Sequence, residues 1–274
     1  MIRRLPVSAP SRPPRLPTPW RLSMLLSVLL CGCALSGSPP DLRTASDQTD
    51  ADRLAQVRLE LASGYFSMGQ AATALDEVKR ALAIKPDFAQ ALNLRGLIYG
   101  QMGQVALAED SFRRALQLTP RDPDVVHNYA WFLCQLRRWQ EADAWFLAAI
   151  DRSAPAGAAR SWRARGVCLG AAQRLEAALD ALARADELEP AHPVTTYHLA
   201  LTLMASGRSE AARARLEPLL QQAETLTEPV LWLAVRLAHR AGDESATRRW
   251  AGLLQARFPG SAAASRLSRG SYDE

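Results

Sequence analysis

Apolar and small residues recur along the chain in a pattern with a period of about 34 residues. Proline follows an apolar segment at Pro86 and again at Pro120, 34 residues later. The next such proline is Pro190, which lies two further periods plus two residues along the chain. Two helical segments joined by a short turn fit within each period, so the pattern predicts an all-helical chain of stacked helix pairs.

The residue types at fixed positions of each period agree with the tetratricopeptide repeat (TPR), a helix–turn–helix unit of 34 residues. The unit 89–122 has Gly96, Gly103, Ala108, Phe112 and Ala115 at positions where this repeat has the same types. The alanines let paired helices approach closely, and Phe112 fills the space between them. Gly103 suits the turn, where a chain leaving a helix often needs a positive φ.

Six units of this kind are predicted, and together they form a solenoid over residues 53–260. The units are 55–88, 89–122, 123–156, 159–192, 193–226 and 227–260, with Gly157 and Ala158 as a two-residue insertion. Pro218 interrupts the second helix of the fifth unit, and the sixth unit matches weakly, as terminal solenoid repeats often do. We expect residues 261–274 to be a frayed tail.

The positive net charge of +5 is confined to the start of the chain. The first 32 residues contain five arginines (Arg3, Arg4, Arg12, Arg15 and Arg21) and no Asp or Glu. The rest of the chain has 28 basic and 28 acidic residues and is therefore neutral. Nucleic-acid binding, which needs a basic surface, loses its compositional support.

The first 33 residues have the features of an export signal. The apolar run at 22–30 is too short to span a bilayer but fits the apolar region of a signal peptide. Leu30-Cys31-Gly32-Cys33 resembles a bacterial lipobox, and Gly32 supplies the small residue before the cleavage point. By that resemblance residues 1–32 are removed and Cys33 is acylated. Simple secretion, with cleavage nearby, is the alternative.

A lipobox also implies where the protein is located. Several acyl chains anchor a protein stably where a single chain does not. Ala34, rather than Asp, follows the acylated Cys33, which implies transfer to the outer membrane in the enterobacterial sorting system. Residues 33–52 are rich in Pro, Ser and Asp and are predicted to be a flexible tether. We therefore expect a lipid-anchored protein on the periplasmic face of the outer membrane.

Side chains that carry chemistry are sparse along the chain. His127, His192, His198 and His239 do not have metal-ligand spacing, and the sequence has no nucleophile, phosphate-binding or dinucleotide-binding motif. We therefore expect neither an enzyme nor a metal, cofactor or small-molecule substrate.

Two cysteines, Cys134 and Cys168, lie in the first helices of adjacent units at repeat positions 12 and 10. Those positions need not face each other, so two buried thiols are favoured over a disulfide, although an oxidising periplasm would allow one.

The stretch HNYAWFLCQ, residues 127–135, is the most unusual segment of the repeats. First helices of a TPR line a groove mainly through positions 2, 5, 9 and 12, with position 6 beside them. His127, Asn128, Trp131 and Cys134 occupy positions 5, 6, 9 and 12 of the third unit, whereas Tyr129 and Phe132 are expected to pack against neighbouring helices. An aromatic ring and an amide suit the capture of a peptide, although Trp131 filling a gap between repeats is the alternative. The candidate partner-binding residues are Asn93, His127, Asn128, Trp131 and Arg163.

The same stretch resembles a known family. Residues 128–134, NYAWFLC, are similar to the NYGWFLC signature of the type IV pilus biogenesis/stability lipoprotein, the pilotin of the pilus secretin, with Ala130 in place of glycine. Leu254, Arg257, Phe258, Pro259 and Ser261 match a second family motif near the C-terminus. The resemblance implies a scaffold that binds the pilus secretin subunit and promotes its outer-membrane localisation and multimerisation. The alternative is a TPR lipoprotein of another envelope assembly, such as barrel assembly or murein-enzyme complexes.

Overall fold

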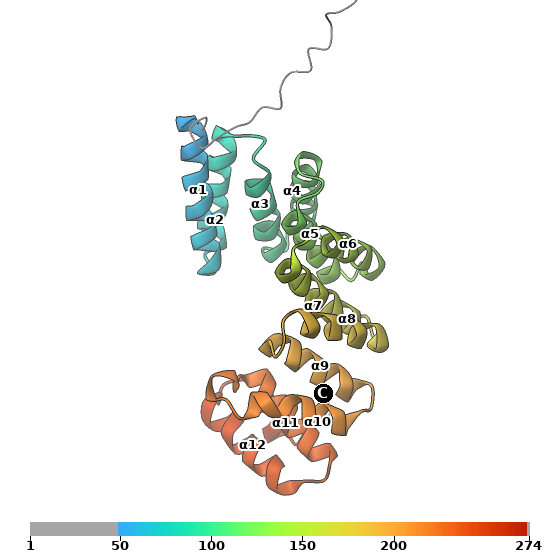
Figure 1. The fold of residues 1–274 in the computed structure, drawn as a ribbon. Coiled ribbons are helices and arrows are strands. Elements are labelled where there is room, and N and C mark those ends of the chain that lie inside the picture. Colours follow the sequence, from blue (N-terminus) through green and yellow to red (C-terminus); the bar gives the residue numbers. More distant parts are fainter. Residues whose placement is uncertain (1–48, 273–274) are drawn as a thin grey trace, which may run out of the picture. The chain divides into compact units, whose positions relative to one another are not determined.

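The computed structural model describes residues 49–272 of the chain, which belong to one compact unit (Figure 1). The expected signal peptide, the acylated Cys33 and most of the expected tether lie outside these residues. The helices are α1 (Asp50–Ser67), α2 (Ala71–Ile84), α3 (Ala89–Gln101), α4 (Val105–Leu118), α5 (Pro123–Gln135), α6 (Trp139–Arg152), α7 (Pro155–Ala171), α8 (Leu175–Leu188), α9 (Pro193–Ala205), α10 (Ser209–Leu220), the short 3₁₀ helix η2 (Ala223–Thr225), α11 (Glu228–Arg240), α12 (Glu244–Arg257) and α13 (Ala262–Ser268). Within residues 49–272 there is no strand, and no helix is long and apolar enough to cross a membrane.

Helices α1 to α12 form six antiparallel pairs that stack in chain order. Each helix packs mainly against its own partner and against the helix that follows in the chain. The first helices of neighbouring pairs also touch each other, from α1 with α3 through α9 with α11. Contacts only between neighbouring units define a solenoid. The prediction of an all-helical TPR solenoid is confirmed.

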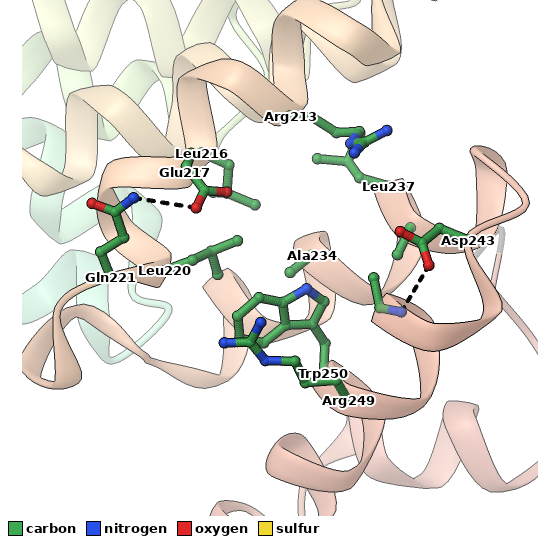
Figure 2. A pocket seen from close by; sticks show the side chains of 12 residues that line it. Arg213, Leu216, Glu217, Leu220, Gln221, Ala234, Leu237, Asp243, Arg249 and Trp250 are labelled. Atoms are coloured by element: carbon green, nitrogen blue, oxygen red, sulfur yellow. Dashed lines mark hydrogen bonds between the residues drawn. The ribbon is translucent and has the colours of Figure 1, made fainter.

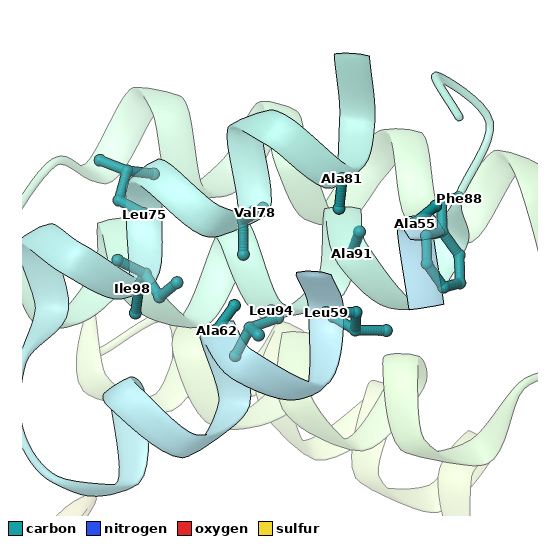
Figure 3. Close-up of a cluster of buried hydrophobic side chains, with 11 residues drawn as sticks. Ala55, Leu59, Ala62, Leu75, Val78, Ala81, Phe88, Ala91, Leu94 and Ile98 are labelled. Carbon is teal, nitrogen blue, oxygen red and sulfur yellow. The ribbon is translucent and has the colours of Figure 1, made fainter. Parts of the chain in front are cut away.

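Small residues allow the helices to approach closely, and large residues fill the space that remains. Figure 3 shows this in the first two pairs, where Ala55, Ala62 and Ala81 are fully buried around Leu75 and Val78. The same alternation continues along the solenoid with Ala108, Ala115, Ala142 and Ala149 around Phe112 and Phe146, all of them fully buried.

The glycine at the centre of two first helices is required by this packing. A Cβ on Gly96 would lie 2.9 Å from the ring of Phe112, and one on Gly166 would lie 2.5 Å from Cγ of Leu182. These distances are shorter than van der Waals contact, so a larger residue at either position would push the paired helices apart.

The turn inside each pair uses a residue with positive φ. Gly103 has a φ of 72°, as the sequence predicted, and Gly69, Gly207 and Gly242 adopt the same conformation, with φ of 75°, 79° and 69°. The third and fourth pairs differ, because Arg137 and Gln173 hold φ of 58° and 60° at the equivalent turns. An L-residue with a side chain pays about 1–2 kcal/mol for that conformation, a cost that glycine avoids.

The expected two-residue insertion is part of a helix and does not form a loop. Gly157 and Ala158 lie inside α7, which has 17 residues where α5 and α9 have 13. Pro155 at the start of α7 supplies the fixed φ that suits the first turn of a helix. The insertion therefore lengthens the first helix of the fourth pair at its N-terminal end.

The tail that we expected to be frayed contains a folded helix. Ala263 and Leu267 of α13 are buried against Leu231, Trp232 and Leu254 of the last pair. Beyond α13, the ring of Tyr272 stacks on His239 with centroids 4.0 Å apart. The expectation was wrong because α11 has an apolar outer face, and burying that face stabilises a capping helix at the end of the solenoid.

Cys134 and Cys168 form a disulfide across α5 and α7, which corrects the expectation of two free thiols. Their Cα atoms lie 5.8 Å apart, and the two residues are separated by 34 positions in the chain. His127 and Ser161, also 34 positions apart, form a hydrogen bond between the same two helices. Residues of α5 and α7 that face each other are therefore not at equivalent repeat positions. Cys134, at position 12 of its unit, faces Cys168, at position 10 of the next unit.

We expect Gly166→Ala to destabilise the protein by about 1–3 kcal/mol, because its new Cβ would clash with Leu182. Gly64→Ala is the matched control, since Gly64 also lies within a helix but has no atom within 4 Å of the added Cβ. The control should be stabilised by about 0.5–1 kcal/mol through helix propensity. Urea unfolding of both variants tests this, and equal stability changes would contradict the packing argument.

Removing the disulfide by Cys134→Ala and Cys168→Ala together should lower stability by about 3–4 kcal/mol, as expected for a closed loop of this length. The measurement is urea unfolding with and without a reductant. The reductant should destabilise only the wild type, and the double variant should unfold at the same concentration in both conditions. A wild type insensitive to reductant after complete thiol release would contradict the prediction.

Candidate functional site

One apolar side chain from each of four successive first helices reaches the surface that these helices share. Leu97 of α3, Trp131 of α5, Val167 of α7 and Leu201 of α9 all stand at repeat position 9 and are partly exposed. We call these four residues the groove row. Solenoids present extended concave surfaces in this way, because equivalent helices repeat at a regular interval.

Trp131 is the largest member of the groove row and is held firmly. Its helix begins at Pro123, and the side chain of Asp122 accepts hydrogen bonds from the backbone N–H groups of Asp124 and Val125. Trp131 packs on the buried cluster that contains Phe132 and Leu133, yet remains partly exposed. It therefore offers a rigid aromatic surface, which costs little conformational entropy when a partner binds.

Tyr129 and Phe132 pack as predicted. Both are buried, and both rings lie close to Phe112 of the preceding pair, with centroids 5.8 and 5.3 Å away. The hydroxyl of Tyr129 also donates to Glu109 over 3.3 Å. The aromatic residues of this stretch thus divide between core and surface, and Trp131 is the one that is left partly exposed.

Asn93 and Asn128 are joined across α3 and α5. Nδ2 of Asn128 donates to Oδ1 of Asn93 over 3.3 Å. Among the described residues, Nδ2 of Asn93 and Oδ1 of Asn128 have no hydrogen-bond partner, and both residues are partly exposed. A donor and an acceptor therefore remain free beside Trp131, which matches the needs of a peptide group in an extended segment.

His127 does not face the groove, contrary to the expectation. Its side chain is buried, Nδ1 lies 2.9 Å from Oγ of Ser161, and its ring meets Phe146 edge-on. Burial lowers the pKa of His127 to about 4, and the nearby guanidinium of Arg160 contributes. The ring is therefore neutral at physiological pH and joins two repeats. The offset between α5 and α7 places repeat position 5 against a neighbouring helix here.

Arg163 has its charge already paired within the chain. Its side chain is only 13% exposed, and Nη2 lies 3.1 Å from Oε2 of Glu189. Nη1 also approaches the hydroxyl of Thr195 at 3.4 Å. Arg163 therefore links α7 to the start of α9, and it contributes less to a binding surface than its repeat position suggested.

A second apolar surface, which the sequence interpretation missed, lies on α1 and on Met68, the residue that caps its C-terminal end. Leu54, Val57, Leu61 and Met68 are 48%, 50%, 44% and 61% exposed. Some of these side chains surround Gly64 in a shallow pocket of about 420 Å³. We call these four residues the apolar face of α1. Their helical spacing is visible in the sequence, and Ala55, Leu59 and Ala62 on the other side of α1 form the core of the repeat.

A larger pocket lies between α10, α11 and α12, with a volume of about 440 Å³ (Figure 2). Its apolar wall includes Leu216, Leu220 and Trp250, and its rim carries both acidic and basic residues. The rim groups have partners within the chain, since Asp243 caps α12 and Glu217 accepts from Gln221. The guanidinium of Arg249 lies over the ring of Trp250, 4.3 Å from its centroid, so this rim charge is also engaged within the pocket wall.

Within residues 49–272 no cluster of His, Cys, Asp and Glu could hold a metal ion.

Comparisons with known proteins agree with the repeat architecture. Family models for the tetratricopeptide repeat match residues 63–103, 89–122 and 171–238. No curated protein matches the chain. One similar solved structure is that of PilW, which is described as a widely conserved type IV pilus biogenesis factor. PilW is 27% identical to this chain, with a TM-score of 0.72. The match covers 79% of this chain and 99% of PilW.

Two further solved structures share the fold at lower identity. PilF of Pseudomonas aeruginosa is 22% identical with a TM-score of 0.68, over 81% of this chain and all of PilF. A tetratricopeptide repeat protein of Parabacteroides merdae is 13% identical with a TM-score of 0.62, over 80% of this chain and 84% of its own length. From its helix pairs, its packing positions and these matches, the chain is a tetratricopeptide repeat protein.

Proposed function

We propose that this TPR protein is a scaffold of type IV pilus biogenesis. In this proposal it is anchored through lipid on Cys33 to the periplasmic face of the outer membrane. There it binds the pilus secretin subunit and promotes the localisation and multimerisation of the secretin. The observation that carries the proposal is the similarity to PilW, which at 27% identity extends over 99% of the PilW chain.

The groove chemistry supports a role in protein binding. The groove row offers apolar contacts from four successive repeats, and the Asn93–Asn128 pair offers a free donor and a free acceptor beside them. An extended partner segment needs both kinds of contact, because its side chains require apolar surface and its backbone requires hydrogen bonds. Catalysis needs activated groups within reach of one another, and the groove row provides none.

The lipid anchor explains why a scaffold would carry the segment before α1. A tether of the composition found at 33–52 lets the solenoid search the space near the membrane while it remains attached. Attachment also raises the effective concentration of the scaffold near a membrane-bound partner.

Replacing Trp131 by alanine should weaken binding to the purified secretin about 30-fold, because a central aromatic anchor contributes about 2 kcal/mol or more. Asn128→Ala should weaken binding about threefold to tenfold, since it removes a free acceptor and the bond to Asn93. Titration calorimetry gives the affinities, and thermal melting shows whether each variant is folded.

Two controls locate the binding surface. Tyr129→Phe removes the hydroxyl that donates to Glu109 and keeps the buried ring, so it should leave the affinity unchanged. Leu61→Ser alters the apolar face of α1, which is distant in sequence from the groove row. The groove assignment would be overturned if the folded Trp131→Ala and Asn128→Ala proteins bound the secretin with wild-type affinity. If Leu61→Ser lost that affinity at the same time, the secretin would bind α1 instead.

Cys33→Ser should release the protein from the membrane fraction and leave the secretin mislocalised, because the acyl chains would be lost. Cys31→Ser is the matched control and should remain in the outer membrane. Fractionation followed by immunoblotting measures both variants. A Cys33→Ser protein that stays in the outer membrane would refute the anchor at Cys33, and release of Cys31→Ser alone would place the acylated residue at Cys31.

A further inference from the structure

Arg137 and Gln173 stand at turn positions where the other pairs have glycine, and the backbone of the turn does not require their side chains. The N–H of Arg137 donates to the carbonyl of Cys134 at 2.9 Å, as the N–H of Gly103 donates to Gly100 at 3.1 Å. The turn geometry is therefore the same with either kind of residue. Residues held in such conformations cluster at ligand-binding sites, which makes the two side chains candidates for binding.

The two side chains are also unused in the fold. Within the described part of the chain, neither the guanidinium of Arg137 nor the amide of Gln173 makes a hydrogen bond or an ion pair. The neighbouring arginines behave differently, because Arg138 is paired with Glu109 and Glu141, and Arg174 approaches Asp143. The strained positions thus carry the polar groups that remain free.

Both side chains line one pocket, which we call the turn pocket. It lies between the turns of the third and fourth pairs and has a volume of about 520 Å³. Trp131, Trp139 and Val167 supply its apolar walls, while Gln135, Arg137 and Gln173 supply its polar groups. The turn pocket shares Trp131 and Val167 with the groove row, so it is continuous with the proposed binding surface.

The charge of the turn pocket is of one sign. Arg137 is its one charged lining residue, and no acidic residue lines it. The carboxylates of the adjacent helix are already engaged, since Asp143 lies 2.6 Å from Arg165 and Glu141 lies 2.6 Å from Arg138. A pocket lined by one guanidinium, two tryptophans and two amides is complementary to a carboxylate next to an apolar side chain.

We propose that the turn pocket binds a partner segment in which an aromatic residue is followed by an aspartate or glutamate. The aromatic ring contacts Trp131 and Trp139, and the carboxylate pairs with the guanidinium of Arg137. The amide of Gln173 donates to a backbone carbonyl of the segment. This inference rests on the proposed function only in taking the secretin as the source of the segment.

The direct test uses a short peptide and the purified full chain. Acetyl-Gly-Phe-Asp-Gly-amide is titrated while the indole N–H signals of Trp131 and Trp139 are followed by NMR. The Phe-Asn and Ala-Asp versions of the peptide serve as controls. We expect saturable shifts with Phe-Asp, about tenfold weaker binding with Phe-Asn, and a loss of affinity as salt is raised.

Glycine substitutions separate binding from folding. Arg137→Gly and Gln173→Gly remove the side chains and relieve the positive φ, so both should raise the melting temperature. Arg137→Gly should bind the Phe-Asp peptide about tenfold more weakly than wild type and no better than it binds Phe-Asn. Ala191→Gly is the matched control, since Ala191 also has a positive φ, of 57°, but lies outside the turn pocket. It should gain stability and keep its affinity.

The outcomes distinguish this inference from the proposed function. Absence of indole shifts in wild type, or equal peptide affinity of Arg137→Gly and wild type, overturns the turn pocket as a binding site. The turn pocket is also overturned if Arg137→Gly binds the secretin with wild-type affinity while Trp131→Ala loses that affinity. In that case the proposed function stands. If the peptide binds as expected and the secretin does not bind the wild type, the turn pocket stands and the secretin is the wrong partner.

Discussion

The close approach of paired helices at Gly96 and Gly166 is the constraint on which the rest of the solenoid depends. A Cβ at either position would lie within 3 Å of the large residue that faces it, Phe112 or Leu182. The second and fourth pairs are therefore compact, and the first and third pairs have the fully buried Ala62 and Ala130 at the equivalent position. Because small and large residues alternate in the same way in successive pairs, side chains at one repeat position form a continuous row. The groove row is a direct result of that alternation.

Much of the fold could be predicted from the sequence because its determinants are local. The period of 34 residues, the alanines and the turn glycines each act within one unit, and the structure agrees with them. The C-terminal helix could not be predicted in the same way. Its stability comes from contact with Leu231 and Trp232 of another unit, and its own short sequence contains no repeat signature.

The candidate site was predicted less well, because it depends on how neighbouring helices are offset. Repeat position alone placed His127 in the groove and kept Cys134 and Cys168 apart. In the structure the facing residues of α5 and α7 are 34 positions apart, although the insertion makes equivalent turns 36 positions apart at Arg137 and Gln173. That offset buries His127 against Ser161 and brings the two sulfur atoms together. The offset does not affect Trp131, because its exposure depends on α5 alone. Nor does it affect the Asn93–Asn128 pair, which joins α3 and α5, two helices of units that have no insertion between them.

The disulfide between Cys134 and Cys168 changes how a linear array of repeats loses its structure. In such an array each unit is held only by its neighbours, so unfolding can begin at an end and proceed one unit at a time. A covalent bond at the junction of the third and fourth units stabilises that junction against progression from either end. The array then behaves as two flanking segments around a central pair of units that open last. Amide protons in α5 and α7 should accordingly be the slowest to exchange with solvent.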